Sequence, residues 1–152
     1  MRIKRTHQVY LGLGSNLGNR ESVLLQAIKL IGERVGQVLR RSSFIETEPW
    51  GFESEHRFLN AAVCCETELT PRQVLQTTQQ IERDLGKRKC HATKRQKEIN
   101  YQDRPIDIDI LLYDDLIVDE PDLKIPHPLM YQREFVMRPL NEIREPQSLQ
   151  NL

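Results

Sequence analysis

The segment from Ile106 to Tyr113 limits the possible folds of this chain more than any other, because its side chains alternate in character. Asp107 and Asp109 are separated and flanked by isoleucines. Successive side chains of a β-strand point to opposite faces of the sheet. We therefore predict a strand that packs its isoleucines into a core and presents two carboxylates on the other face, with Cα atoms roughly 6.6 Å apart.

Two longer helices are predicted from their apolar spacing and their end signals. Apolar residues recur at helical spacing from about 20 to 35, and Asn19 is placed to cap that helix. Thr70 and Gln73 form a Thr-x-x-Gln capping box with a proline at the first helical position. Gly86 is a typical residue at the end of this second helix.

The order of the predicted elements indicates the fold class. Further strands are expected over 9–13, 38–47 and 58–68, and a short helix from about Phe135. Strand–helix–strand units in tandem are typical of an α+β, ferredoxin-like fold, with one layer of helices packed on a mainly antiparallel sheet. A chain of 152 residues suits one domain over 1–152, with frayed ends at 1–7 and 145–152.

Composition excludes several classes of protein. Lysine plus arginine equals aspartate plus glutamate at 22 each, so net charge attracts neither nucleic acid nor an anionic membrane. The longest apolar run, Ala61–Cys65, is too short to span a bilayer, and the N-terminus lacks the apolar core of a secretory signal. Three cysteines, two of them adjacent, do not make a disulfide framework. We expect a cytoplasmic protein.

The charges are nevertheless segregated along the chain. Residues 83–104 hold eight basic side chains and three acidic ones, whereas 105–123 hold seven acidic side chains and no basic one. A solvated loop beside a polar strand would account for this pattern. A nucleotide–magnesium site would also account for it, because phosphates attract cations and divalent metals bind carboxylates. Sequence alone leaves both interpretations open.

Asp107 and Asp109 are the candidate metal ligands. Two carboxylates on one strand face can hold one magnesium ion or bridge two, although Asp-x-Asp is also common on exposed strands. His127 lies between two prolines, which restrict its backbone conformation. A histidine held in this way could contact a phosphate or could form only a local hydrogen bond. The segment Gly12–Asn16 is neither a dinucleotide fingerprint nor a Walker A loop, and a tight strand-to-helix turn is the favoured interpretation.

Six segments together resemble the 6-hydroxymethyl-7,8-dihydropterin pyrophosphokinase family of folate biosynthesis. They are Tyr10-Leu-Gly-Leu-Gly-Ser-Asn-Leu-Gly18, Thr47-Glu-Pro-Trp-Gly51, Phe58-Leu-Asn-Ala-Ala62, Arg104-Pro-Ile-Asp-Ile-Asp-Ile-Leu111, Ile125-Pro-His-Pro128, and Arg133-Glu-Phe-Val136 followed by Arg138-Pro-Leu140. The resemblance runs in order from about residue 9 to 143. It implies a transferase that moves diphosphate from ATP to the pterin hydroxymethyl oxygen and releases AMP.

The resemblance also implies roles for individual residues. Asp107 and Asp109 match the ligands of two Mg²⁺ ions, and Arg104, Asp107, Asp109, His127 and Arg133 form the implied catalytic set. The implied ATP-binding set is Gln79, Glu82, Lys87, Lys89, Tyr101, Arg104, His127 and Arg133. The implied pterin-binding set is Thr47, Glu48, Trp50, Phe58, Asn60 and Phe135, with the two phenylalanines stacked on the ring.

Two departures from the family pattern lie in the basic segment. The family commonly has Gly-Arg-x-Arg after the second helix, whereas here Gly86 is followed by Lys87-Arg88-Lys89, and Tyr101 stands in place of a tryptophan. Lysine is a point charge rather than a bidentate fork, so the grip on phosphate differs. We expect this segment to close over ATP and exclude water.

We expect the protein to be a monomer that binds small-molecule substrates and no nucleic acid. Two other functions remain as alternatives. A ferredoxin-like RNA-binding module would use the basic segment and aromatic residues on the sheet. A metal-dependent phosphohydrolase would share the two carboxylates but would use water as its nucleophile.

Overall fold

The computed structural model describes residues 6–47, 57–86 and 105–144. A five-stranded sheet has the order β2–β4–β1–β5, and β3 also pairs with β4; every pairing is antiparallel. Its strands are β1 (His7–Ser15), β2 (Gly36–Arg41), β3 (Ile45–Thr47), β4 (Phe58–Thr67) and β5 (Asp107–Tyr113). A smaller sheet pairs β6 (Val118–Glu120) with β7 (Leu123–Ile125).

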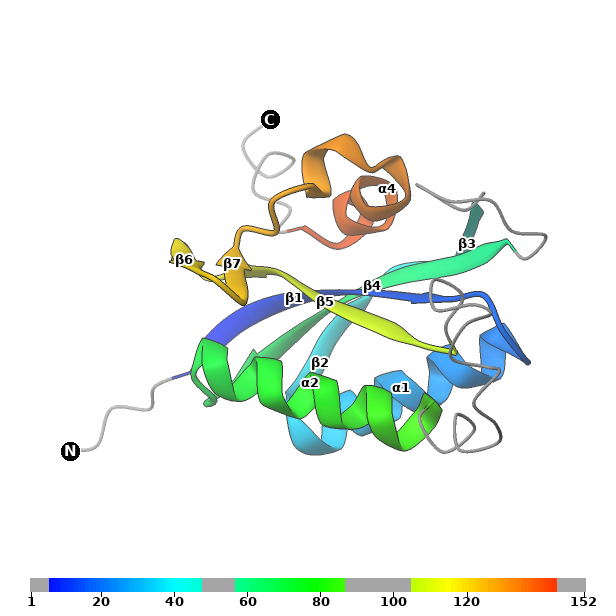
Figure 1. Ribbon diagram of the computed structural model, residues 1–152, viewed down its shortest axis with the longest axis horizontal. Coiled ribbons are helices and arrows are strands. Elements are labelled where there is room, and N and C mark those ends of the chain that lie inside the picture. The colour runs from blue at the N-terminus through cyan, green and yellow to red at the C-terminus, as the bar shows by residue number, and fades with distance from the viewer. Residues whose placement is uncertain (1–5, 48–56, 87–104, 145–152) are drawn as a thin grey trace.

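Helices cover both faces of the large sheet (Figure 1). Helices α1 (Arg20–Arg34) and α2 (Pro71–Gly86) pack on one face. The isoleucines that flank and separate the two aspartates, Ile106, Ile108 and Ile110, are buried on this face. Helix α4 (Glu134–Ile143), preceded by the 3₁₀ turn η2 (Met130–Gln132), packs on the other face. The predicted α+β, ferredoxin-like fold is confirmed. The predicted single layer of helices is wrong, because the apolar side of α4 covers the second face.

Both predicted helix starts have the expected caps. The side-chain oxygen of Asn19 accepts a hydrogen bond from the Ser22 backbone N–H at 3.1 Å. Thr70 and Gln73 exchange two hydrogen bonds, of 3.1 Å from the Gln73 N–H to the threonine hydroxyl and 2.9 Å from the Thr70 N–H to the glutamine carbonyl. The capping box therefore satisfies two donors at the start of α2.

The strand predictions need three corrections. The single strand expected over 38–47 is divided into β2 and β3, because the buried hydroxyl of Ser42 replaces a strand carbonyl and accepts the Ala62 N–H at 2.9 Å. Strand β1 begins at His7, which therefore belongs to the sheet rather than to a frayed end. Strands β6 and β7 were not predicted, since three residues each give too little alternation. Among the described helices, none is both long and apolar enough to cross a membrane.

Candidate active site

Two rows of paired residues run across the sheet on the α4 face. In one row, Gly14 of β1 pairs with Asp107 of β5 on one side and with Asn60 of β4 on the other. In the next row, Gly12 pairs with Asp109 and with Ala62. Paired residues of antiparallel strands point to the same face. The two predicted metal ligands and the predicted pterin-binding asparagine therefore lie on one surface, separated by glycines.

Asp107 and Asp109 are half-buried on this surface, and the isoleucines beside them are buried on the opposite face, as predicted. Their oxygens are hard ligands of the kind that Mg²⁺ prefers. Within the described residues, no three His, Cys, Asp or Glu side chains form a group that could hold a metal by itself. This donor set fits Mg²⁺, which is commonly held by one or two carboxylates together with substrate phosphates and water.

His127 lies close enough to Asp107 and Arg133 for the charges of both to act on its imidazole. The His127 backbone N–H donates to the Leu111 carbonyl of β5 at 3.1 Å, and its Nδ1 accepts the Leu129 N–H at 3.4 Å. Burial lowers the pKa of the His127 imidazole, the charge of Arg133 lowers it further, and the charge of Asp107 opposes these effects. These effects together favour the neutral ring, and the bond that Nδ1 accepts places the hydrogen of the neutral form on Nε2.

The described members of the predicted pterin-binding set come from three elements. Asn60, 4% exposed, donates from Nδ2 to the Thr47 hydroxyl of β3 at 2.6 Å. Phe58 pairs with Thr47 in the β3–β4 register, so it shares the face of Asn60. Phe135 lies in the first turn of α4, and the Arg133 guanidinium carbon is 5.7 Å from its ring centre. A polar edge and aromatic side chains therefore occupy the same side of the sheet.

Glu82 has a contact that sequence reasoning did not anticipate. Its Oε2 accepts the backbone N–H of Ile108 at 2.6 Å, between the two aspartates on β5. Gln79, one turn earlier on α2, is exposed. These two residues belong to the helix on the opposite face, and Glu82 reaches β5 at the edge of the large sheet. The described contact of Glu82 is thus with the strand that carries the carboxylates.

Six predicted site residues lie outside the described residues. They are Glu48, Trp50, Lys87, Lys89, Tyr101 and Arg104. The expected closure of the basic segment also falls outside this part of the chain. The predictions for these residues therefore remain predictions from sequence.

Gly14 is the site residue that sequence reasoning missed. Gly12 lies within the strand predicted over 9–13, but β1 continues through Gly14, which we expected to belong to the following turn, and both glycines are on the carboxylate face. Glycine is unfavourable inside a strand unless another group approaches closely. The signal that could have indicated this is a pair of glycines at positions i and i+2 of an apolar strand, because such a pair leaves one face of the strand without side chains.

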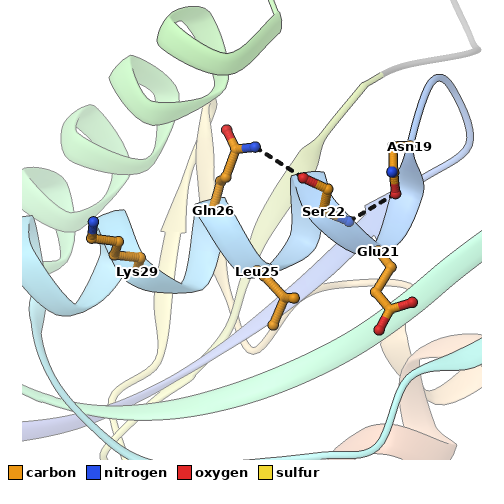
Figure 2. Close-up of a pocket in the computed structure, with 6 residues that line it drawn as sticks. All are labelled: Asn19, Glu21, Ser22, Leu25, Gln26 and Lys29. Carbon is orange, nitrogen blue, oxygen red and sulfur yellow. Dashed lines mark hydrogen bonds between the residues drawn. The ribbon is translucent and has the colours of Figure 1, made fainter.

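A hollow of about 420 Å³ lies elsewhere, along α1 (Figure 2). The residues that line it are Asn19, Glu21, Ser22, Leu25, Gln26 and Lys29. Figure 2 shows the bond from Gln26 to Ser22 beside the Asn19 cap. Because α1 packs on the face opposite to α4, this hollow is separate from the carboxylate surface.

A family profile and two curated relatives of this chain are all described as the same pyrophosphokinase. A sequence profile described as 7,8-dihydro-6-hydroxymethylpterin-pyrophosphokinase matches residues 10–145. A 2-amino-4-hydroxy-6-hydroxymethyldihydropteridine pyrophosphokinase of Porphyromonas gingivalis is 52% identical over 136 residues, which are 89% of this chain and 89% of the relative. The protein of that name from Bacillus subtilis is 42% identical, over 88% of this chain and 76% of its own.

Solved structures support the fold. A crystal structure described as HPPK-DHPS in complex with substrates matches with a TM-score of 0.68 and 16% identity. The match covers 91% of this chain but only 40% of that larger chain. At this identity the likeness concerns the fold alone. From the profile match and the identity to curated relatives, the chain belongs to the 7,8-dihydro-6-hydroxymethylpterin-pyrophosphokinase family.

Proposed function

We propose that this protein transfers a diphosphate from ATP to the hydroxymethyl group of 6-hydroxymethyl-7,8-dihydropterin in folate biosynthesis. The pterin oxygen attacks the β-phosphorus, the bond between that phosphorus and the α–β bridging oxygen breaks, and AMP leaves. The hydroxyl proton is lost in the same overall step. Membership of the family supports this assignment.

One observation carries the proposal: a single row of the sheet joins Asn60 to Asp107 through Gly14. The pterin would lie at the Asn60 end, next to Phe58 and Phe135, and the triphosphate at the carboxylate end. Position 14 contributes no side chain of its own, so the Asn60 end and the carboxylate end of the row adjoin on one surface. Holding two reactants in this geometry is itself a large part of catalysis.

Asp107 and Asp109 would hold two Mg²⁺ ions together with the phosphates of ATP. When bound, these ions would neutralise charge on the phosphate oxygens and orient the nucleotide for displacement. The protein contributes the placement of both carboxylates on one rigid strand, whose isoleucines are fixed in the core.

His127 and Arg133 are proposed to bind the phosphates from the side of the sheet that α4 covers. The neutral His127 ring would donate from Nε2, because its Nδ1 already accepts the Leu129 N–H. Arg133 precedes the first residue of α4, where a guanidinium can contact phosphate in a bidentate manner. Both residues would stabilise charge that develops on the phosphate oxygens during transfer.

The same proposal covers the substrates, the oligomeric state, the cellular location and the other residues of the two binding sites. Its substrates would be the two small molecules ATP and a dihydropterin, bound by one domain of a monomeric, cytoplasmic protein. Lys87, Lys89, Tyr101 and Arg104 would contribute to the ATP site, with Gln79 and Glu82 on α2. Glu48 and Trp50 would complete the pterin site with Thr47.

The test mixes the protein with Mg²⁺, ATP and 6-hydroxymethyl-7,8-dihydropterin and measures adenosine products. AMP that forms only in the presence of the pterin supports the transferase. ADP, or no nucleotide product, contradicts it. The RNA-binding and phosphohydrolase alternatives receive no support from the family comparison, and the hydrolase predicts a nucleotide product that forms without pterin.

A further inference from the structure

Gly14 occupies the position between the two halves of the candidate site. It lies in β1 and pairs with Asn60 on one side and Asp107 on the other. The backbone conformation does not require glycine there, since Gly18 is the only glycine with positive φ in the described parts of the chain. The reason for glycine at position 14 must therefore be the small volume of its side chain.

The carboxamide of Asn60 fills the space above Gly14. A Cβ atom added at position 14 would lie 2.9 Å from Asn60 Oδ1 and 3.4 Å from Phe58 Cδ1. The first distance is shorter than real Cβ contacts allow, so the carboxamide would have to move. Asn60 is 4% exposed and is held by its 2.6 Å bond to Thr47, so a shift of the carboxamide would change the geometry of a buried hydrogen bond.

Gly12 offers a natural comparison on the same strand and the same face. A Cβ atom at position 12 would lie 3.3 Å from Leu111 Cδ1. The Leu111 side chain is itself 1% exposed, but it would need to shift by only a few tenths of an ångström and has no polar bond to lose. Alanine at position 12 is therefore tolerable, whereas alanine at position 14 displaces a polar group of the candidate site.

We propose that Gly14 is a positioning residue for pterin binding: its missing side chain allows the Asn60 carboxamide to lie against the strand at the depth that the pterin edge requires. The inference rests on the proposed function and extends it to a residue that touches the ring edge only through Asn60. Gly14 thereby acts on the pterin and leaves the ATP side of the row unchanged.

The test compares Gly14→Ala with Gly12→Ala in the AMP assay. Gly14→Ala is expected to raise the KM for the pterin about tenfold, the effect of losing one or two well-placed hydrogen bonds, and to leave the KM for ATP within about twofold. Gly12→Ala is expected to leave both KM values within about twofold. Equal effects of the two variants, or an equal rise in both KM values for Gly14→Ala, would overturn the proposal.

A double-mutant cycle with Asn60→Ala isolates the mechanism. Once the carboxamide is absent, alanine at position 14 should cause no further rise in the pterin KM. A further tenfold rise in Gly14→Ala/Asn60→Ala relative to Asn60→Ala would contradict the proposal. This comparison holds even where Gly14→Ala alone does not fold, because the double variant removes the clash.

A readout without catalysis separates this inference from the proposed function. The side-chain amide signals of Asn60 in a ¹H–¹⁵N NMR spectrum are expected to shift in Gly14→Ala and to stay unchanged in Gly12→Ala. Unchanged signals in Gly14→Ala would overturn the inference whatever the reaction catalysed. Conversely, a shift combined with no pterin-dependent AMP in the wild type would contradict the proposed function alone.

Discussion

The carboxylate of Glu82 on α2 accepts the backbone N–H of Ile108 on β5 at 2.6 Å. Strand β5 is at the edge of the large sheet, so this N–H faces away from β1. Glu82 therefore supplies the acceptor that a neighbouring strand would otherwise provide. The contact fixes the backbone at the residue between Asp107 and Asp109, which links α2 to the spacing of the two carboxylates.

Replacement of Glu82 is predicted to loosen this part of β5. Glu82→Leu should reduce the free energy of unfolding by about 1–3 kcal/mol, because a half-buried N–H loses a charged acceptor. Amide exchange at Ile108 should accelerate in the same variant. Urea denaturation and hydrogen exchange measure the two effects. Glu82→Gln keeps an acceptor oxygen and serves as the matched control, and equal losses in both variants would argue against the hydrogen bond as the cause.

Asp109→Asn is predicted to abolish most activity without unfolding the protein. The amide keeps the size of the carboxylate but binds Mg²⁺ poorly, so kcat should fall by about a hundredfold or more. The melting temperature should change little, since the side chain is half-buried and lies outside the apolar core. Asp115→Asn, an exposed aspartate after β5, is the control and should keep full activity. Near-normal turnover in Asp109→Asn would contradict the metal-binding role.

The contact between Glu142 and Ser43 predicts a dependence of stability on pH. Hydrogen bonds from the Ser43 backbone N–H (2.8 Å) and from its hydroxyl lower the pKa of the Glu142 carboxyl below 4.5. A lowered pKa means that the stabilisation is fully present above pH 4.5 and is lost as the pH falls through the folded-state pKa. Between pH 7 and pH 3, Glu142→Gln should therefore destabilise the protein most at pH 7, and the effect should shrink as the pH falls through the folded-state pKa.

The expected loss at pH 7 is at most about 1 kcal/mol, because Glu142 is exposed and solvent screens its charge. Denaturation midpoints of wild type and Glu142→Gln across this pH range measure the effect. Glu33→Gln, at an exposed position of α1, controls for a general change in net charge. A difference between wild type and Glu142→Gln that grows toward acid pH would have the wrong sign.

Cys64 and Cys65 are predicted to be inert toward thiol reagents in the folded protein. Both are fully buried, and burial, with a smaller effect of Cys64, raises the pKa of the Cys65 thiol to about 12. The variant Cys90→Ser removes the third cysteine of the chain and leaves only Cys64 and Cys65. Since the thiolate is the reactive form, this variant should show no rapid reaction with a disulfide reagent at pH 8. Two thiols should react after denaturation. Rapid labelling of either thiol in the native state would show that this part of β4 opens locally.

Local sequence signals predicted much of this molecule correctly. The Asn19 cap, the Thr70–Gln73 capping box and the alternation around Asp107 are each decided by residues within a few positions of one another. Such signals give the type and the approximate ends of an element. They also correctly placed the two aspartates on the face away from the isoleucine core.

The missed features depend on contacts between distant segments. The role of Gly14 follows from its pairing with Asn60 and Asp107, and pairing register cannot be read from any one strand. Helix α4 lies on the second face because its apolar side meets residues of β1, β4 and β5. Glu82 contacts Ile108 across 26 positions of sequence. In each case the local pattern was compatible with several partners.

Strands β1 and β4 have neighbours on both sides, and they carry Gly14 and Asn60, respectively. Amide protons in such central strands usually exchange only through global unfolding. The floor of the candidate site would then be among the last regions to open, and a bound pterin would protect the whole molecule rather than one loop. Ligand affinity could accordingly be measured from the slowest-exchanging amides of β1 and β4, with no assay of turnover.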